Sequence, residues 1–171
     1  MSQERILRAK YYHALNLLPS LGPVRIKKLI QHFGTPEQVW KATRQDLLEV
    51  KGFTLNLREK ILQERQNIHP GKSWDKVLQR GYSFVTWEDS HYPPLLREIY
   101  DPPPLLYYCG NIDIVNGYCL AIVGSRRHTV YGREIAYKFA SGLSSYGLTV
   151  VSGMARGIDT WAHKGTLDAG G

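Results

Sequence analysis

Residues 120–169 decide the fold of this chain, and they read LAIVGSRRHTVYGREIAYKFASGLSSYGLTVVSGMARGIDTWAHKGTLDA. Short apolar runs at 120–123 and 148–151 flank a segment, about 130–146, whose apolar residues recur at helical spacing. Continuous apolar runs are typical of parallel strands that are covered on both faces. We therefore expect a strand, a crossover helix and a second, parallel strand, joined in the right-handed sense. The apolar stripe of the helix comprises Ile135, Phe139, Leu143 and Tyr146.

Each predicted strand leads into a loop that contains glycine and arginine and that opens a helix. In open α/β sheets, ligands bind at this carboxyl edge of the strands, where helix N-termini offer N–H groups to an anion. Glycine lets a phosphate approach the backbone, and arginine supplies two parallel donors. The sequence therefore predicts a phosphate site in which arginines clamp the anion and neighbouring residues donate hydrogen bonds or add charge. Its candidate residues are Gly124, Ser125, Arg126, Arg127, Ser152, Gly153, Arg156 and Lys164.

The two loops lack the marks of a dinucleotide site or of a catalytic site. The next glycine after Gly124 is Gly132, which departs from GxGxxG, and Ser152 stands where an acidic residue would bind a ribose hydroxyl. No cysteine or carboxylate cluster accompanies His128 or His163, and no nucleophile is paired with a base. We expect no catalytic residues, no metal ion and no cofactor. The alternative to a phosphate site is that the glycines of the two loops only make turns and the arginines are solvated.

Three further residues are expected to have structural roles. Asp159 precedes a predicted helix at 160–167, and a carboxylate there is a good N-cap because it accepts from the free N–H groups of the first turn. Cys109 and Cys119 lie on or beside predicted strands without metal-ligand spacing. We therefore expect buried thiols in a reducing compartment.

The composition is that of an ordinary soluble protein. The chain has 171 residues, of which 43% are hydrophobic and 22% charged, enough for one domain or two small ones. Its apolar runs are far shorter than the roughly 20 residues that span a bilayer. The N-terminus carries scattered charge and lacks the apolar core of a signal peptide. These features predict a cytoplasmic protein without a membrane partner.

Positive charge is concentrated in the first part of the chain. Residues 1–72 contain 13 Lys and Arg against 6 Asp and Glu, whereas residues 73–171 contain 9 of each, which gives the formal net charge of +7. A basic surface favours nucleic acid or an anionic membrane as partner. No predicted helix pairs a strongly basic face with a bulky apolar face, so nucleic acid is the favoured partner.

Residues 4–69 are predicted to be helical, with two hairpin turns at 18–22 and 50–54. The pair is similar to tandem helix-hairpin-helix motifs, which bind phosphate through hairpin N–H groups, although Ser20 and Thr54 each replace a glycine of that pattern. The hairpins either contact DNA phosphates or only turn the chain with solvated charges around them. The candidate contacts are Arg25, Lys27, Lys28 and Lys51.

Residues 69–73 are the predicted linker to a second domain, because they combine Pro, Gly and Ser. A short helix at 74–80 and strands at 82–87 and 105–109 are expected to follow. The aromatic residues of this extension are candidates for base stacking. Because aromatic residues at strand spacing usually belong to a core, we prefer that interpretation. They are Trp87, Tyr92, Tyr107 and Tyr108.

The segments VGSRRHTVYG at 123–132 and SGMARGIDTWAHKGTLDAGG at 152–171 resemble the DNA-processing protein A (DprA/Smf) family, as does HYPPLLREIYDPPPLLYYCGN at 91–111. The resemblance implies an α/β fold, with a small all-helical domain of helix-hairpin-helix or SAM-like type at 1–70. A Rossmann-like parallel-sheet domain at 73–171 would follow it, truncated where the family continues with further strands and helices.

The same resemblance implies a function in DNA metabolism. Family members bind single-stranded DNA, load RecA onto it and protect incoming DNA during natural transformation and recombination. Self-association and contact with RecA are expected mainly from the portion that follows residue 171 in the family. A rival from another class is a Rossmann-like enzyme that hydrolyses nucleoside monophosphates and holds the nucleotide phosphate at the same loops.

Overall fold

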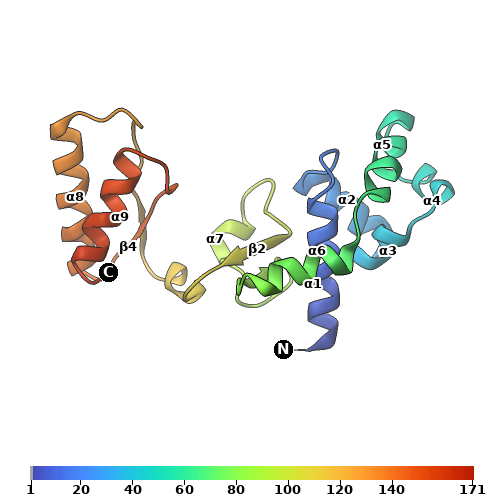
Figure 1. The fold of residues 1–171 in the computed structure, drawn as a ribbon, viewed down its shortest axis with the longest axis horizontal. Coiled ribbons are helices and arrows are strands. Elements are labelled where there is room, and N and C mark those ends of the chain that lie inside the picture. The colour runs from blue at the N-terminus through green and yellow to red at the C-terminus, as the bar shows by residue number, and fades with distance from the viewer. Residues whose placement is uncertain (1) are drawn as a thin grey trace. The chain divides into compact units, whose positions relative to one another are not determined.

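The structure is a computed structural model that describes residues 2–171. The chain divides into two compact units, and the boundary along the sequence lies between Gly110 and Asn111 (Figure 1). Each unit contains helices and one two-stranded sheet. The fold therefore belongs to the predicted α/β class, with helices preceding a parallel strand pair.

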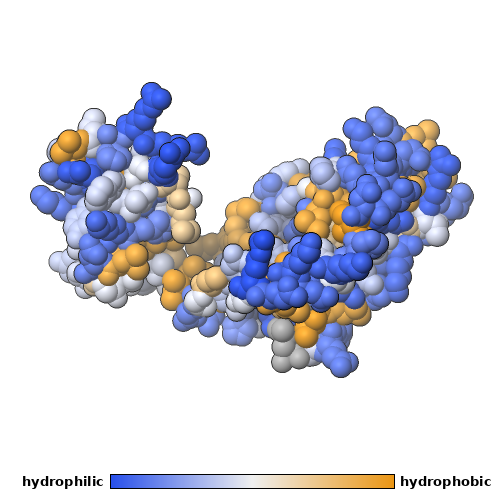
Figure 2. Space-filling view, in the orientation of Figure 1, coloured by the Kyte–Doolittle hydropathy of each residue, from blue (hydrophilic) through white to orange (hydrophobic). Residues whose placement is uncertain are grey.

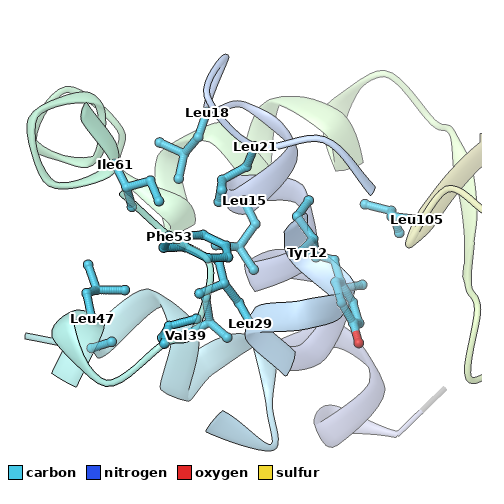
Figure 3. Close-up of a cluster of buried hydrophobic side chains, with 14 of the residues drawn as sticks. Tyr12, Leu15, Leu18, Leu21, Leu29, Val39, Leu47, Phe53, Ile61 and Leu105 are labelled. Carbon is cyan, nitrogen blue, oxygen red and sulfur yellow. The ribbon is translucent and has the colours of Figure 1, made fainter. Parts of the chain in front are cut away.

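The first unit begins with six helices, and caps account for most of their starts. Ser2, Thr35, Thr43 and Thr54 each accept a hydrogen bond from a backbone N–H in the first turn of the helix that follows. Apolar side chains from all six helices meet in one core, part of which is drawn in Figure 3. The helices are α1 (Gln3–Asn16), α2 (Pro23–Phe33), α3 (Pro36–Lys41), α4 (Arg44–Leu48), α5 (Leu55–Gln66) and α6 (Pro70–Gln79).

An antiparallel hairpin of β1 (Ser83–Thr86) and β2 (Leu105–Tyr108) completes the first unit, with α7 (Pro94–Arg97) in the connection. The hairpin is fastened to α1 by polar contacts. The Trp87 indole N–H donates to the Tyr12 hydroxyl at 2.9 Å, and this hydroxyl donates to Glu88 at 2.7 Å. Burial and the neighbouring carboxylate raise the pKa of Tyr12, which keeps the hydroxyl a donor.

The predicted linker at 69–73 is wrong, because Pro70 is the first residue of α6. Proline fits that position, since its missing N–H would have no partner within the helix. Trp74 of α6 is 2% exposed and its ring stands edge-on to Phe84 of β1 at 4.9 Å between centroids. The extension therefore packs into the helical core, and the break between compact units lies at 110–111 instead of 70–73.

The second unit confirms the predicted strand, helix and parallel strand. β3 (Cys119–Ala121) pairs with β4 (Thr149–Val151) in parallel, and α8 (Val130–Ser145) connects them. A short 3-10 helix, Ile112–Asn116, precedes β3, and α9 (Ile158–Asp168) follows β4. α8 and α9 pack side by side (Figure 1).

Burial in the second unit is lower than the sequence predicts. All three residues of β3 are exposed, and so are both cysteines, which the sequence predicts to be buried. Of the predicted helix stripe, Phe139 is 62% exposed and Tyr146 is 86% exposed. The physical reason is that α8 packs on its neighbours through a small residue, Ala140, which clusters with Val150 of β4 and Ala162 of α9. An apolar hollow of about 580 Å³ lies beside β3 and the larger side chains of α8.

No helix within the described residues 2–171 has both the length and the apolar character needed to cross a membrane.

Candidate nucleic-acid interface

Two loops leave the carboxyl ends of β3 and β4, as the parallel pairing requires. We call residues 124–129 loop 1 and residues 152–157 loop 2. Loop 2 turns sharply, since Met154 has a φ of 52° and Gly157 a φ of 103°. A Cβ on Gly157 would lie 2.2 Å from the Ser125 carbonyl oxygen and 2.6 Å from the Arg126 Cα, so only glycine permits this contact between the loops.

Asp159 connects loop 1 to loop 2. Its carboxylate accepts hydrogen bonds from the N–H groups of Gly124 at 3.4 Å, Gly153 at 3.1 Å and Ala155 at 3.4 Å. The predicted N-cap role of Asp159 is therefore wrong: Gly157 is the N-cap, and Asp159 is the second residue of α9. The carboxylate lies at the positive end of the helix dipole but bonds to both loops instead of to its own first turn.

The protonation of Asp159 follows from these contacts. Burial by itself would raise the pKa of this side chain, which is 5% exposed. The hydrogen bonds from the Ala155, Gly124 and Gly153 amides act in the opposite direction, and the net result is a pKa below the ordinary value. Asp159 is thus a buried anion that the chain itself supplies at the sheet edge.

This internal anion takes up donors that the sequence assigns to a ligand. The N–H groups of Gly124 and Gly153 donate to Asp159, and the Ser152 hydroxyl donates to the Ile122 carbonyl at 2.6 Å. The Ser125 hydroxyl bonds to the N–H and the carbonyl of Arg127, both at 3.0 Å. These four residues shape the loops, so their expected role as direct phosphate donors is not supported by the geometry.

The three loop arginines differ from these four residues in that their charged side chains are exposed to solvent. Arg126, Arg127 and Arg156 are all exposed, and they come from the two loops that Gly157 and Asp159 hold together. Hydrophilic residues predominate on the visible face around α8 and α9 in Figure 2. An exposed guanidinium on a fixed loop suits an anion that approaches from solvent, because its planar fork binds two phosphate oxygens at once.

Lys164 lies on α9 and is exposed. Its ammonium is 5.1 Å from the centroid of the Trp161 ring, which is within the range of a cation–π contact. The indole N–H of Trp161 donates to His128 of loop 1 at 3.1 Å. Trp161 is a residue of this region that our sequence reasoning missed. The signal was a tryptophan three residues before a lysine, which places both on one helix face.

In the first of the two helical hairpin turns, at residues 18–22, donors and acceptors are likewise bonded within the chain. The Ser20 N–H and hydroxyl donate to Glu64 at 3.1 and 2.7 Å, and Arg25 donates to the Ser20 carbonyl at 2.6 Å. Lys27, Lys28 and Lys51 remain exposed. The Lys28 ammonium lies 2.7 Å from where a Cβ on Gly52 would stand, so the basic residues of α2 adjoin the second hairpin.

Of the aromatic residues of the extension, Tyr92 and Trp87 pack, as we preferred, whereas Tyr107 is 40% exposed. Tyr92 is fully buried, Trp87 contacts Tyr12, and the Tyr107 hydroxyl lies 2.5 Å from the His13 ring. Within residues 2–171, no group of three or more His, Cys, Asp or Glu side chains is placed to hold a metal ion.

Comparison with known proteins adds independent evidence. Residues 83–171 match the model of the family described as DNA recombination-mediator protein A. Protein Smf of Synechocystis sp. is 39% identical over 94% of this chain and 42% of its own length. The DNA processing protein DprA of Streptococcus pneumoniae is 44% identical over 56% of this chain and 33% of its own length.

A solved structure agrees with these relatives. The X-ray structure of DNA processing protein A from Streptococcus pneumoniae superposes with a TM-score of 0.73 at 30% identity, over 95% of this chain and 55% of that chain. The chain thus spans less than half the length of the curated relatives named above. On the family match and the extent of these identities, this chain belongs to the DNA recombination-mediator protein A family.

Proposed function

We propose that this chain binds single-stranded DNA through the arginines of loops 1 and 2. The observation that carries the proposal is the arrangement of Arg126, Arg127 and Arg156, exposed on two loops that Asp159 and Gly157 lock together. Three guanidinium groups on a fixed edge suit successive phosphates of a strand and read no base sequence. Lys164 adds charge on the neighbouring helix.

The hairpin residues provide a second, weaker DNA contact in this proposal. Arg25, Lys27, Lys28 and Lys51 are exposed. Because Glu64 engages the Ser20 donors, this contact depends on side-chain charge more than on hairpin N–H groups.

Membership of a recombination-mediator family extends the proposal to the longer protein. There the bound strand is handed to RecA and protected in the cytoplasm during transformation and recombination, with self-association and RecA contact made beyond residue 171. The chain contributes the DNA-binding edge to that process.

The rival function is hydrolysis of nucleoside monophosphates. A nucleotide phosphate at this sheet edge would need the amides of Gly124 and Gly153, and these already donate to Asp159. A buried carboxylate at that position repels a second anion. This observation favours an extended phosphodiester on the exposed arginines over a small nucleotide in the loops.

Binding to single- and double-stranded oligonucleotides of equal length, over a range of salt concentrations, tests the proposal. We expect sequence-independent binding that weakens steeply with salt, by a log–log slope of roughly −0.7 for each phosphate contact on single strands. Salt-independent binding, or no binding at low salt, would contradict it. Release of free base from nucleoside monophosphates by the chain, followed by chromatography, would instead establish the rival.

A further inference from the structure

Trp161 of α9 lies among cationic side chains next to loop 1. The Arg133 guanidinium carbon is 5.2 Å from the centroid of its ring, and the Lys164 ammonium is 5.1 Å away. Arg133 belongs to α8, so the two cations reach the indole from two different helices. Such contacts fix the ring in place and put positive charge beside an aromatic surface.

His128 fixes the ring further. Its Nδ1 faces the Thr129 carbonyl at 3.2 Å, which only accepts, so Nδ1 carries the proton. Nε2 is then the acceptor, and the Trp161 indole N–H donates to it at 3.1 Å. Because His128 belongs to loop 1, the ring is tied directly to the loop that carries Arg126 and Arg127.

A hollow of about 360 Å³ opens beside the indole, lined by Arg133, Glu134, Tyr137, Lys138 and Trp161. Its volume lies within the range of about 300–1,000 Å³ that is typical of small-ligand sites. The Tyr137 hydroxyl donates to Asp168 at 2.9 Å, which joins α8 to α9 along this wall. The walls are therefore held in position before any ligand arrives.

The chemistry of the lining selects the kind of ligand. The lining carries one carboxylate, Glu134, which disfavours a phosphate beside it, and two cations, Arg133 and Lys138, which favour phosphates next to the hollow. An uncharged planar group with phosphates on either side meets both conditions. Nucleobases stack on aromatic side chains and on arginine guanidinium planes, whatever their sequence.

We infer that Trp161 and Arg133 form a base-stacking subsite for one unpaired nucleobase, next to the phosphate-binding arginines of loop 1. The inference rests on the proposed binding of single-stranded DNA and adds to it a contact with the bases. It predicts a preference for single strands over duplexes, since a paired base has no free face to offer.

The test compares two ligands of equal length and charge: an oligodeoxythymidylate and an abasic phosphodiester oligomer. Trp161→Ala is expected to weaken thymidylate binding about five- to 150-fold, the range for loss of one stacked base, and to change abasic binding less than about twofold. Trp161→Phe loses the hydrogen bond to His128 but keeps an aromatic ring on which a base can stack. This variant should therefore recover most of the affinity. Tyr146→Ala removes an exposed aromatic ring of the same unit and should leave both ligands unaffected.

The outcomes distinguish a failure of the base-stacking subsite from a failure of the proposed binding of single-stranded DNA. If Trp161→Ala weakens both ligands equally, or neither, or if Trp161→Phe is as weak as Trp161→Ala, Trp161 only supports loop 1 and the subsite is refuted. If the unaltered chain binds neither ligand at low salt, the proposed function itself fails. Melting temperatures of the variants show whether α9 stays folded. Where Trp161→Ala unfolds the unit, quenching of indole fluorescence decides the question. Thymidylate but not the abasic oligomer should quench the native chain, and this quenching should be absent from Trp161→Phe, which keeps the other three tryptophans.

Discussion

The Asp159 carboxylate accepts a hydrogen bond of 3.1 Å from the backbone N–H of Gly153, and its other oxygen faces the N–H of Gly124. One side chain thereby bridges the ends of two parallel strands. At the edge where related sheets bind anionic ligands, this chain holds an anion of its own. In the proposed function, the surface left for DNA consists of the arginines around that bridge.

The bridge makes the stability of the second unit depend on the charge of Asp159. Its pKa in the folded chain lies below the ordinary value of about 3.9. The ionised form therefore stabilises the fold above about pH 4, and this contribution disappears as the pH falls through the lowered pKa. We expect the native chain to be more stable than Asp159→Asn near neutrality. Denaturant unfolding at a series of pH values should show this difference shrinking below about pH 4; a difference that persists into strong acid would contradict the assignment.

The contact between Gly157 and loop 1 predicts a steric effect. In Gly157→Ala, the new methyl group meets the Ser125 carbonyl and the Arg126 backbone at a φ of 103°. We expect a loss of about 1–3 kcal/mol in the free energy of unfolding, together with weaker DNA binding because loop 1 must move.

Gly142 supplies the matched control for that substitution. It lies within α8, and a Cβ there meets nothing within 4 Å. Gly142→Ala should therefore stabilise the chain by about 0.5–1 kcal/mol without changing DNA affinity. Equal effects of the two alanines in urea unfolding would show that the loop contact contributes nothing.

The packing of the hairpin β1–β2 against α1 predicts where the chain can be cut. A fragment of residues 1–70 lacks Trp74, Phe84 and Leu105, each at most 4% exposed in the core. Removing even one such side chain typically costs about 2–5 kcal/mol, so this fragment should not unfold cooperatively. A fragment of residues 1–110 should. Calorimetry of the two fragments checks this, and a cooperative transition in the shorter one would restore the boundary at residues 70–73.

The sequence predicted the parallel pair β3–β4 and the crossover helix α8 because short apolar runs and helical periodicity are local signals. It did not predict that α6 starts at Pro70, because helix formation there depends on burying Trp74 against Phe84, a contact that only the folded chain reveals. The exposure of Cys119 and Phe139 likewise depends on which faces the rest of the unit covers.

The candidate site was predictable in its charges and not in its hydrogen bonds. The glycines and arginines of loops 1 and 2 stand out by type and spacing. The assignment of Asp159 as an N-cap followed a local rule, whereas its actual partners at Gly124 and Gly153 lie across the sheet edge. For Trp161, the spacing to Lys164 was a local signal, whereas the contacts with Arg133 of α8 and His128 of loop 1 could not be predicted from neighbours in the sequence.

A single substitution measures the contribution of one loop arginine. Arg126→Ala should weaken binding to single-stranded DNA by about 1–3 kcal/mol, the range for hydrogen bonds between charged groups, with a change in folding stability within about 0.5 kcal/mol. Arg126→Lys should recover only part of the loss, because it keeps the charge without the planar fork. Full affinity in Arg126→Ala, or a loss matched by a lower melting temperature, would make Arg126 a structural residue.

The salt dependence of single-stranded DNA binding, with and without the three loop arginines, tests the central claim most directly. If Arg126, Arg127 and Arg156 each bind one phosphate, replacing all three by alanine should reduce the magnitude of the log–log slope by about 2, at roughly 0.7 per contact. Affinity at low salt should fall in parallel, while the melting temperature stays near that of the native chain. An unchanged slope and affinity in the triple variant would contradict the account and place the DNA elsewhere on the chain.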